Sequence, residues 1–376
     1  MKILTIGLNP FLNLKNAKIN RSLLKHFSQT DNIESIVLNF DNIQFLSKEN
    51  GYFWENTKLH PYSGEKGGLQ KFIINICKKV QPDIIITIGD YSDHFAIWQI
   101  KERYPNLFKW ICILVNGLDK INLKFAECLK LSDLIITTTQ NVQENLKKYI
   151  NNNILHIPYG TCNFYSYNTN RELKVLLLSK NYQTSNLQSI FNAIKYTKLK
   201  AYLHTNINDS GDNDLSNILT NYNIELPYKY VSNHEGYSDE ELNQKINECK
   251  IVIDCSFYSS TGLSLLDGMA GGCLPIGINY GAVGEIINNL PEEYRFFVNF
   301  NKFYGNWGEK YAVIDESHLS VILEILKKKD KGWWEKGEYY INNVLKKYKE
   351  IDFFNKFKEE AEKVIYCEDS IIVDVY

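Results

Sequence analysis

The chain has 376 residues, of which 44% are hydrophobic and 23% are charged. This length suits two domains of about 150 to 200 residues each, and the composition is typical of an ordinary globular protein. The formal net charge of −2 excludes a global positive field that would gather nucleic acid or acidic lipid, although it leaves a local patch open. Bulk charge therefore does not reveal the partners of the chain.

The amino terminus and the cysteines carry no sign of export. The run ILTIGL after Met1-Lys2 is too short and too poorly flanked to be the apolar part of a signal peptide. No apolar run approaches the ~18 residues needed to span a bilayer, so we expect a cytoplasmic protein without a transmembrane segment. The cysteines include no Cys-x-x-Cys pair, which predicts buried free thiols rather than a zinc site or a disulfide framework.

The first half of the chain alternates short β-rich runs with amphipathic stretches, which predicts a parallel sheet covered by helices. The expected strands are 2–8, 35–40, 83–89, 110–117, 133–139 and 154–160. The expected helices between them are 18–28, 67–80, 93–103, 121–130 and 140–149. We interpret this half as one complete doubly wound α/β domain.

A second α/β series follows a stretch rich in turn formers, 161–172, which we interpret as a linker between domains. Its expected strands are 174–179, 200–205, 224–231, 250–256 and 274–278, and its expected helices are 185–196, 214–222, 238–248 and 262–270. The aromatic-rich end of the chain has helical spacing, which indicates core packing. We therefore predict a Rossmann-like domain over 1–165, a second over 166–335, and helices over 336–376 that pack back towards the first.

Two such domains in sequence predict a central cleft between them, where the carboxyl ends of the strands bind ligands. The segment YSSTGLSLLDGMAGGCLPIGINYGAVGE, residues 258–285, carries more small residues than we expect of a packing element. Its hydroxyl residues are good helix N-caps, and Gly262 would let backbone N–H groups approach a phosphate closely. Asp267 follows about one turn into the helix, where a carboxylate can accept hydrogen bonds from a ribose diol. A second glycine-rich loop is expected to end at Glu285.

The region from about 228 to 290 resembles the signature of GT-B glycosyltransferases, particularly the retaining family 4 (group 1) enzymes. In those enzymes a Glu-x7-Glu pattern leads into AMA-x-G-x-P-V-I and then a GG-x-x-E loop, and GLSLLDGMAGGCLPIGINYGAVGEII follows this order closely. QPDIIITIGD, SDLIITTTQNVQENL and ILHIPYG in the first half are also similar to landmarks of the family. The resemblance therefore spans most of the chain.

The resemblance implies transfer of a sugar from a UDP- or GDP-linked donor, with retention of configuration, without a metal and with no other cofactor. The leaving phosphate would help to take the proton of the acceptor, so no protein nucleophile is expected. The acceptor stays open among a glycan, a lipid-linked sugar, a protein and a nucleic acid.

The chain departs from the family pattern at several polar positions. Ser259 stands where the family has its first Glu, and Asp267, which has a shorter side chain, stands where the family has its second Glu. Lys180 stands where the family has an Arg on the diphosphate, and Ser185 where it has a Lys. A lysine binds a phosphate as a point charge, whereas an arginine can form two parallel hydrogen bonds to it, so the diphosphate should be held less tightly. Asn116 replaces a His that many members carry near the transferred sugar.

The resemblance and the residue types together give a set of candidate site residues. The candidate catalytic residues are Asn116, His94 and Lys180. The candidate substrate-binding residues are Ser259, Ser260, Thr261, Gly262, Asp267, Lys180, Ser185, Gly281, Glu285 and Asn9, and no metal ligand is expected. Each has a plainer structural interpretation: a lone His is more often part of the core, and Glu285 could cap the next helix.

Two other functions are compatible with the same sequence. One is a transferase of this fold that modifies nucleic acid or nucleotides, which a basic stripe would favour. The other is a catalytically weakened subunit that binds a glycan or a nucleotide, which the substitutions at 116, 180, 185 and 259 allow.

Overall fold

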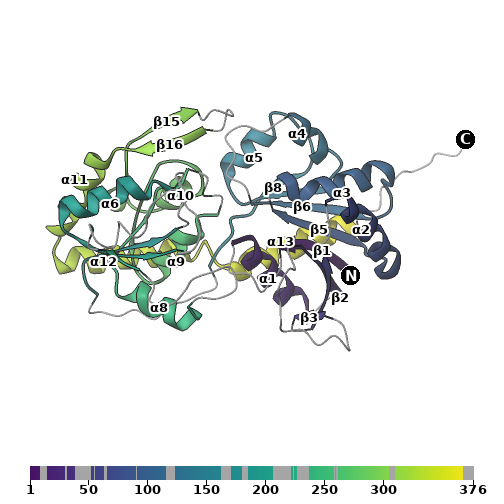
Figure 1. Ribbon diagram of the computed structural model, residues 1–376, viewed down its shortest axis with the longest axis horizontal. Helices are drawn as coiled ribbons and strands as arrows, with labels where there is room; N and C mark the ends of the chain where they lie inside the picture. Colours follow the sequence, from purple (N-terminus) through teal and green to yellow (C-terminus); the bar gives the residue numbers. More distant parts are fainter. Residues whose placement is uncertain are drawn as a thin grey trace, which may run out of the picture. The chain divides into compact units, whose positions relative to one another are not determined.

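A computed structural model describes residues 1–8, 15–29, 32–38, 52–54, 56–62, 66–89, 91–115, 123–161, 171–179, 185–205, 222, 224–226, 237–257, 259, 261–304 and 310–366. The chain divides into two compact units. The first comprises Met1–Asn116, Lys120–Ile157 and Phe353–Tyr376, and the second comprises Pro158–Asp352 with Gly117–Asp119. Figure 1 shows that each unit is built around its own sheet.

The first unit contains an eight-stranded sheet in the order β3-β4-β2-β1-β5-β6-β7-β8. All neighbouring strands run parallel except β3 and β4, which are antiparallel. Every residue of β5 is buried, because helices cover both faces of a parallel sheet, and its sequence is accordingly an almost continuous run of isoleucines. The strands are β1 (Lys2–Leu8), β2 (Asn32–Leu38), β3 (Tyr52–Trp54), β4 (Thr57–Tyr62), β5 (Ile84–Gly89), β6 (Lys109–Leu114), β7 (Leu134–Thr137) and β8 (Ile154–His156).

Among the described residues, the first unit takes five helices from the first 146 residues and one from the C-terminal part of the chain. They are α1 (Lys15–Phe27), α2 (Lys66–Val80), α3 (Tyr91–Arg103), α4 (Leu123–Leu129) and α5 (Gln140–Leu146), joined by the last helix, α13 (Glu350–Tyr366). Aromatic contacts hold α13 on α1. The Phe354 ring stacks on His26 with centroids 5.4 Å apart, and Phe357 meets Phe27 edge-on at 5.6 Å.

The second unit contains a six-stranded parallel sheet in the order β11-β10-β9-β12-β13-β14, and a separate hairpin, β15-β16. Helix α11 packs on α6, and α12 packs on α9 (Figure 1). The strands are β9 (Lys174–Leu178), β10 (Lys200–His204), β11 (Ile224–Glu225), β12 (Ile251–Asp254), β13 (Leu274–Gly277), β14 (Phe296–Phe297), β15 (Phe300–Tyr304) and β16 (Lys310–Ile314). The helices are α6 (Leu187–Thr197), α8 (Asp239–Asn247), α9 (Leu263–Ala270), α10 (Gly281–Ile287), α11 (Glu316–Lys327) and α12 (Lys331–Leu345), with a short 3-10 turn, η2 (Glu292–Tyr294).

The predicted class, two doubly wound α/β units, is confirmed, and the strands of both sheets follow the predicted order along the chain. The sequence analysis missed β3, β4, β14 and the β15-β16 hairpin. It was wrong about the loop expected to end at Glu285, because residues 281–287 form helix α10. The helix expected over 214–222 lies almost wholly outside the described residues, as do 162–170 of the expected linker.

The described cysteines are free and buried, as the sequence predicted: Cys77, Cys112, Cys128, Cys249, Cys255 and Cys273. Burial raises the pKa of the Cys77 thiol to about 11, so it stays protonated at neutral pH. Within the described ranges, no helix is both long enough and apolar enough to cross a membrane.

A network of four charged side chains joins strands β9 and β11 to helix α8. Lys174, whose side chain is only 8% exposed, donates to Glu225 at 2.6 Å and to Glu248 at 2.9 Å. Lys245 donates to the same carboxylates at 2.6 and 3.3 Å. The ammonium groups of Lys174 and Lys245 lie over the buried Tyr202 ring, 5.9 and 5.7 Å from its centroid, so the network covers this edge of the core.

This network predicts a loss of stability in acid. Burial alone would raise the pKa of Glu225, but hydrogen bonds from Lys174 and Lys245 outweigh burial and hold the pKa below its ordinary value of 4.5. A carboxyl whose pKa is depressed by folding stabilises the fold above its unfolded pKa, and this contribution disappears as pH falls through the folded pKa. We expect Glu225→Gln to lower the melting temperature at pH 7 and to differ progressively less from the wild type as pH falls below 4.5. Calorimetric scans of both proteins across this pH range test the prediction. A difference in melting temperature that is the same at every pH would contradict it.

Candidate functional site

Among the described candidates of the second unit, Ser259, Thr261 and Gly281 follow the carboxyl ends of β12 and β13. Strand β12 ends at Asp254, whose side chain is 7% exposed and accepts hydrogen bonds from Ser256 N at 2.9 Å and from Ser259 Oγ at 3.3 Å. The carbonyl oxygen of Ser259 accepts from Ala282 N at 3.4 Å, which joins this loop to the start of α10. The structure therefore brings Ser259 beside a buried carboxylate that sequence reasoning missed. The available signal was a lone Asp that ends an apolar strand at the ligand-binding edge of the sheet.

Helix α9 begins differently from the prediction. The N-cap residue is Gly262, in the left-handed conformation with a φ of 63°, and it provides no side-chain cap. The hydroxyl of Thr261, which is 3% exposed, instead accepts a hydrogen bond from Leu263 N at 3.4 Å. The expectation that the hydroxyl residues serve as the N-cap is therefore wrong for Ser259 and Thr261, while Ser260 lies outside the described residues.

Close packing accounts for most of the glycines in this segment, contrary to the expectation that a packing element would not need them. At four of them an added Cβ would lie within 2.6 Å of a side chain on a neighbouring element: Gly262 against Ile286, Gly268 against Val252, Gly271 against Ile246 and Gly277 against Val283. Gly281 differs, because the only atom near its Cβ position is the Ser259 carbonyl oxygen, at 3.4 Å. Of these five glycines, only Gly281 would place an added Cβ in no more than ordinary van der Waals contact with the described residues.

A pair of matched variants separates the packing from the backbone conformation. Gly262 and Gly281 both have positive φ, 63° and 54°, so alanine strains the backbone at either position by roughly 1 to 2 kcal/mol. Only at residue 262 does the new methyl also collide with Ile286, 2.3 Å away, which should cost about 1 to 3 kcal/mol more. We expect Gly262→Ala to be the less stable variant in urea denaturation. Equal stabilities would mean that packing on α10 does not require glycine.

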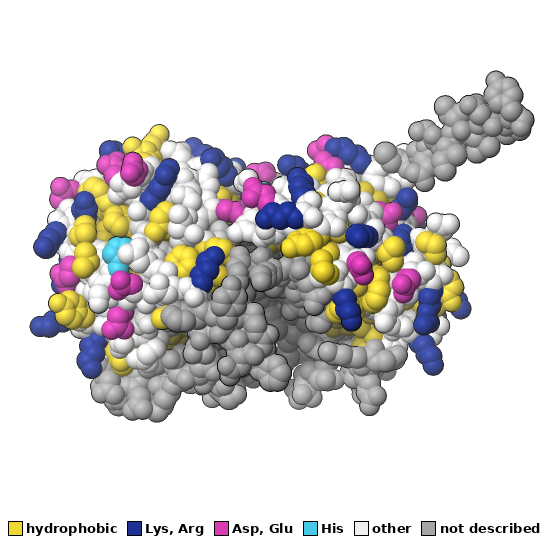
Figure 2. All heavy atoms as spheres, turned by 90° about the horizontal axis from the view of Figure 1, so that it is seen from above, with side chains coloured by type: hydrophobic (Ala, Val, Ile, Leu, Met, Phe, Trp, Pro, Cys, Tyr) yellow, Lys and Arg dark blue, Asp and Glu magenta, His cyan; other side chains and the backbone are white. Residues whose placement is uncertain are grey.

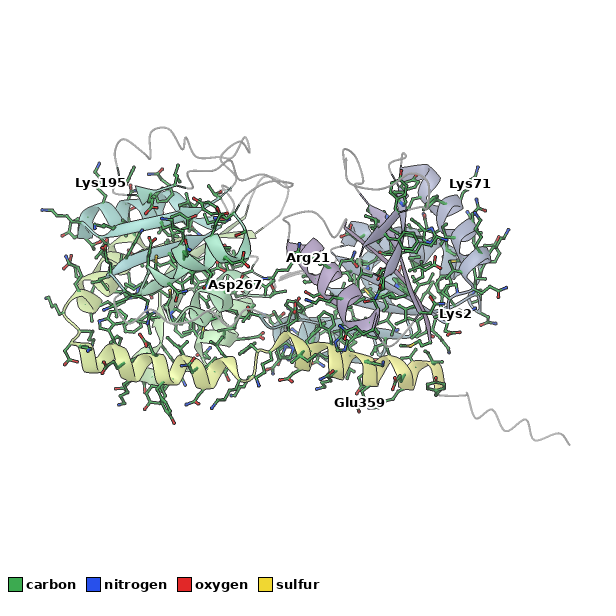
Figure 3. The ribbon with its side chains drawn as sticks, turned by 90° about the horizontal axis from the view of Figure 1, so that it is seen from below. Lys2, Arg21, Lys71, Lys195, Asp267 and Glu359 are labelled. Carbon is green, nitrogen blue, oxygen red and sulfur yellow. The ribbon has the colours of Figure 1, made fainter. Side chains whose placement is uncertain are left out.

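Asp267 lies on helix α9, as predicted, whereas Glu285 lies on helix α10 rather than in a loop. Asp267 is half-buried on α9 (Figure 3), and its Oδ1 accepts a hydrogen bond from Thr161 Oγ1 at 2.8 Å. Glu285 is half-buried on α10. Burial, with a smaller contribution from the charge of Glu285, raises the pKa of Tyr348 to about 12, and the Tyr348 hydroxyl accepts from Asn289 Nδ2 at 3.1 Å. Both carboxylates therefore stand near the two chain segments around residues 161 and 348.

Asn186 joins three elements next to Ser185. Its side chain donates to the Cys255 carbonyl oxygen at 3.0 Å and accepts from Ile314 N at 3.3 Å, which fixes the start of α6 against the ends of β12 and β16. Its φ of 57° is left-handed, a conformation that Asn tolerates better than most residues. Ser185 and Asn186 are both 7% exposed. Ser185 is thereby held at the same edge of the sheet as Ser259.

An aromatic stack connects the β15-β16 hairpin to the same edge. The rings of Phe257 and Tyr280 lie parallel with centroids 4.5 Å apart, and Lys302 Nζ of the hairpin is 4.6 Å from the Tyr280 centroid. Phe257 follows β12 and Tyr280 precedes Gly281, so the stack braces both loops of the candidate site.

His204 ends strand β10 as a neutral side chain. Burial lowers its pKa from 6.5 to about 4, and its Nδ1 lies 3.1 Å from the Tyr202 hydroxyl. The Tyr237 ring lies 5.6 Å from the imidazole. This edge of the sheet therefore offers an uncharged polar group at neutral pH, which the sequence analysis did not identify.

His94, a candidate catalytic residue, lies in the core of the first unit and is 1% exposed. Its Nδ1 is 2.8 Å from Thr87 Oγ1, and its Nε2 is 3.3 Å from the Gly89 carbonyl oxygen. These contacts fit the structural interpretation of a lone His. Besides Ser260, three other candidates lie outside the described residues: Asn9, Asn116 and Lys180. Their roles, and that of His94, stay predictions.

No cluster of three or more His, Cys, Asp or Glu side chains suited to hold a metal ion occurs among the residues that the structure describes. This includes the surroundings of Asp254, whose oxygens accept from serine groups. Metal independence stays a prediction.

Solved structures match both units of the chain, whereas no protein-family model and no curated protein sequence matches it. Sucrose-phosphate synthase from Thermosynechococcus elongatus aligns with a TM-score of 0.76 and 12% identity, covering 98% of this chain and 100% of that one. Anabaena HepE, in complex with UDP-glucose, aligns with a TM-score of 0.74 and 10% identity over 96% of this chain and 100% of that one. A glycosyltransferase from Rickettsia africae aligns with a TM-score of 0.69 and 14% identity over 98% and 99%.

The identities are low, so these matches bear on the fold. Both units are matched together and nearly completely, which a likeness to a single Rossmann-like domain would not give. The chain has the GT-B fold of these glycosyltransferases, as the sequence analysis predicted.

Proposed function

We propose that this chain is a glycosyltransferase that takes the sugar from a nucleotide diphosphate donor, with the donor held at the carboxyl edge of the second sheet. The observation that supports this most strongly is the match of the GT-B fold over 96% or more of the chain, with structures whose names specify a glycosyltransferase or a bound UDP-sugar. UDP is the favoured nucleotide, since HepE is in complex with UDP-glucose and a pneumococcal O-GlcNAc transferase with UDP and GlcNAc. GDP is the alternative.

The diphosphate would lie against the loop from Ser259 to Gly262 and the start of α9. The first N–H groups of a helix lack acceptors within the helix, and the helix dipole adds partial positive charge there, so an anion is stabilised. The lack of a side chain at Gly281, beside the Ser259 carbonyl, would let the donor approach the adjacent loop closely. We place Ser185 and Lys180 around the same diphosphate, Lys180 from the sequence pattern alone, while Asn9 of the first unit stays a candidate from the sequence.

The Asp254 and Ser259 pair is our proposed replacement for the first Glu of the family pattern. The Ser259 hydroxyl donates to the buried Asp254 carboxylate, so its oxygen lone pairs are oriented to accept hydrogen bonds from a sugar hydroxyl. A negative charge is thus present one side chain away from where the family carries it. Asp267 would accept hydrogen bonds from the ribose, and Glu285 would make a further polar contact with the donor.

The transfer itself places most of its charge on the leaving group. The bond between the anomeric carbon and the phosphate oxygen breaks, the acceptor oxygen bonds to that carbon, and the acceptor proton passes to the leaving phosphate on the same face. This course retains the configuration and requires no protein nucleophile. Donors fixed before the reaction would stabilise the developing charge, namely the start of α9 and Lys180.

A weakened, glycan- or nucleotide-binding subunit is the second candidate, and one observation favours it: a serine, tied to Asp254, stands at residue 259. Modification of nucleic acid has less support. On the face shown in Figure 2, the described Lys and Arg side chains are interspersed with Asp and Glu rather than gathered into a basic stripe.

Hydrolysis of nucleotide sugars distinguishes the two candidates. The wild type is incubated without acceptor with UDP-glucose, UDP-GlcNAc and GDP-mannose, and free sugar and nucleotide are measured over time. A transferase should release sugar slowly from at least one donor, because water can replace the acceptor. A binding subunit should bind a donor but release nothing, and repeating the assay with EDTA tests the expected metal independence.

A further inference from the structure

Two distant segments of the second unit run side by side next to the candidate site. Thr161 forms a parallel β-bridge with Lys349, in which Thr161 N donates to the Tyr348 carbonyl oxygen at 3.0 Å. Glu350 N donates back to the Thr161 carbonyl oxygen at 3.4 Å. The backbone of Thr161 is therefore held on both its N–H and its carbonyl side.

These two segments approach each other too closely for a side chain to fit between them. A Cβ added at Gly160 would lie 2.2 Å from the Tyr348 carbonyl oxygen, so the chain passes here with no side chain between the backbones. The Tyr159 hydroxyl also donates to the Glu350 carboxylate. Thr161, which is 6% exposed, is consequently presented from a rigid support.

The Thr161 hydroxyl donates to Asp267 Oδ1 at 2.8 Å, across more than a hundred residues of chain. A carboxylate has about four acceptor positions, so one bond to a hydroxyl fixes its rotamer without exhausting its capacity. The methyl-and-hydroxyl side chain of Thr is itself restricted at χ1. A rigid donor thus orients the one carboxylate on α9.

We propose that Thr161 is a positioning residue that holds the Asp267 carboxylate in the orientation that accepts the ribose hydroxyls of the donor. The proposal rests on the proposed function, since it needs a nucleotide at this edge of the sheet. Without the hydroxyl, Asp267 loses a bond that helps to fix its rotamer, and ordering one side chain on binding weakens affinity by a factor of about 2 to 12. If the hydrogen bond only held α9 to the segment at 161, its loss would change the affinities for ligands with and without ribose hydroxyls equally.

The test uses that distinction on the full chain. Calorimetry measures the affinity of the wild type, Thr161→Val and Thr161→Ser for UDP and for 2′,3′-dideoxy-UDP. We expect Thr161→Val to bind UDP about 3- to 10-fold more weakly than the wild type. We expect Thr161→Ser, which keeps the hydroxyl, to stay within about 2-fold, and all three proteins to bind the dideoxy analogue equally. In an Asp267→Asn background, Thr161→Val should cause a much smaller loss.

Comparing both ligands on the same protein removes the effect of any partly unfolded fraction, because that fraction lowers both affinities alike. If Thr161→Val binds UDP as tightly as the wild type, or loses UDP and the dideoxy analogue equally, the positioning role is overturned. If the wild type binds neither UDP nor GDP, the proposed function itself fails, and the role of Thr161 fails with it.

Discussion

Asp267→Asn should weaken the binding of UDP by a factor of about 10 to 100, because a hydrogen bond to a charged acceptor is worth roughly 1.5 to 3 kcal/mol. The substitution keeps the size of the side chain and one amide oxygen. This oxygen can still accept the hydrogen bond from Thr161 Oγ1, which is 2.8 Å from Asp267 Oδ1 in the wild type. It removes the negative charge and replaces one acceptor oxygen with a donor nitrogen. Calorimetric titration of both proteins with UDP measures the difference.

Glu324→Gln is the matched control for this variant, since it removes one carboxylate charge on α11, where the Glu324 side chain is partly exposed and pairs with Lys327. We expect the control to bind UDP as the wild type does, and both variants to melt within a few degrees of it. Unchanged affinity in Asp267→Asn would mean that the carboxylate has no contact with the nucleotide and serves only its bond to Thr161.

Arg171→Met should destabilise the second unit by roughly 2 to 5 kcal/mol, because the acceptors that pair with the buried guanidinium would lose their hydrogen bonds. The guanidinium, 2% exposed, donates to the Gly271 carbonyl oxygen at 3.0 Å and to Cys249 O at 3.5 Å, and pairs with Glu338 of α12. It therefore joins the end of α9 to α12, which lies along one side of the second unit in Figure 3. Methionine fills similar volume but donates nothing. Calorimetry should show the melting temperature fall by roughly 5 to 20 °C.

Lys200→Met provides the control, because Lys200 forms an ion pair with the residue next to Arg171. Its Nζ is 3.0 Å from Glu172, but the two side chains are 61% and 63% exposed, so the pair should contribute less than about 1 kcal/mol. Comparable losses in the two variants would contradict the view that burial of Arg171 makes it structurally important.

Periodicity predicted the fold well where residues are buried in regular elements. The strands β1, β5, β9, β12 and β13 are short apolar runs with helical patterns between them, so position along the chain and element type could both be inferred. The missed elements lack this pattern. Strand β14 has two residues, β3 has three, and the β15-β16 hairpin stands outside the parallel sheet that the alternation predicts.

The candidate site was predicted less completely, because its contacts join residues that are distant in sequence. The motif selected Ser259, Thr261 and Gly281, which follow β12 and β13, but it explained Gly262 by a ligand, whereas an added Cβ there would lie 2.3 Å from Ile286. The roles of Thr161 and Asn186 depend on partners 106 and 128 residues away, and no local pattern indicates such pairs.

The most direct test of the central claim is hydrogen exchange, followed by mass spectrometry, on the wild type with and without saturating UDP. A donor site at the carboxyl edge of the second sheet predicts slower exchange in peptides covering 254–263 and 277–287, with unchanged exchange in strand β2. GDP in place of UDP should give the same pattern if guanine is the natural base. Failure of both nucleotides to slow exchange in these two segments, or protection confined to the first unit, would contradict the proposed donor site.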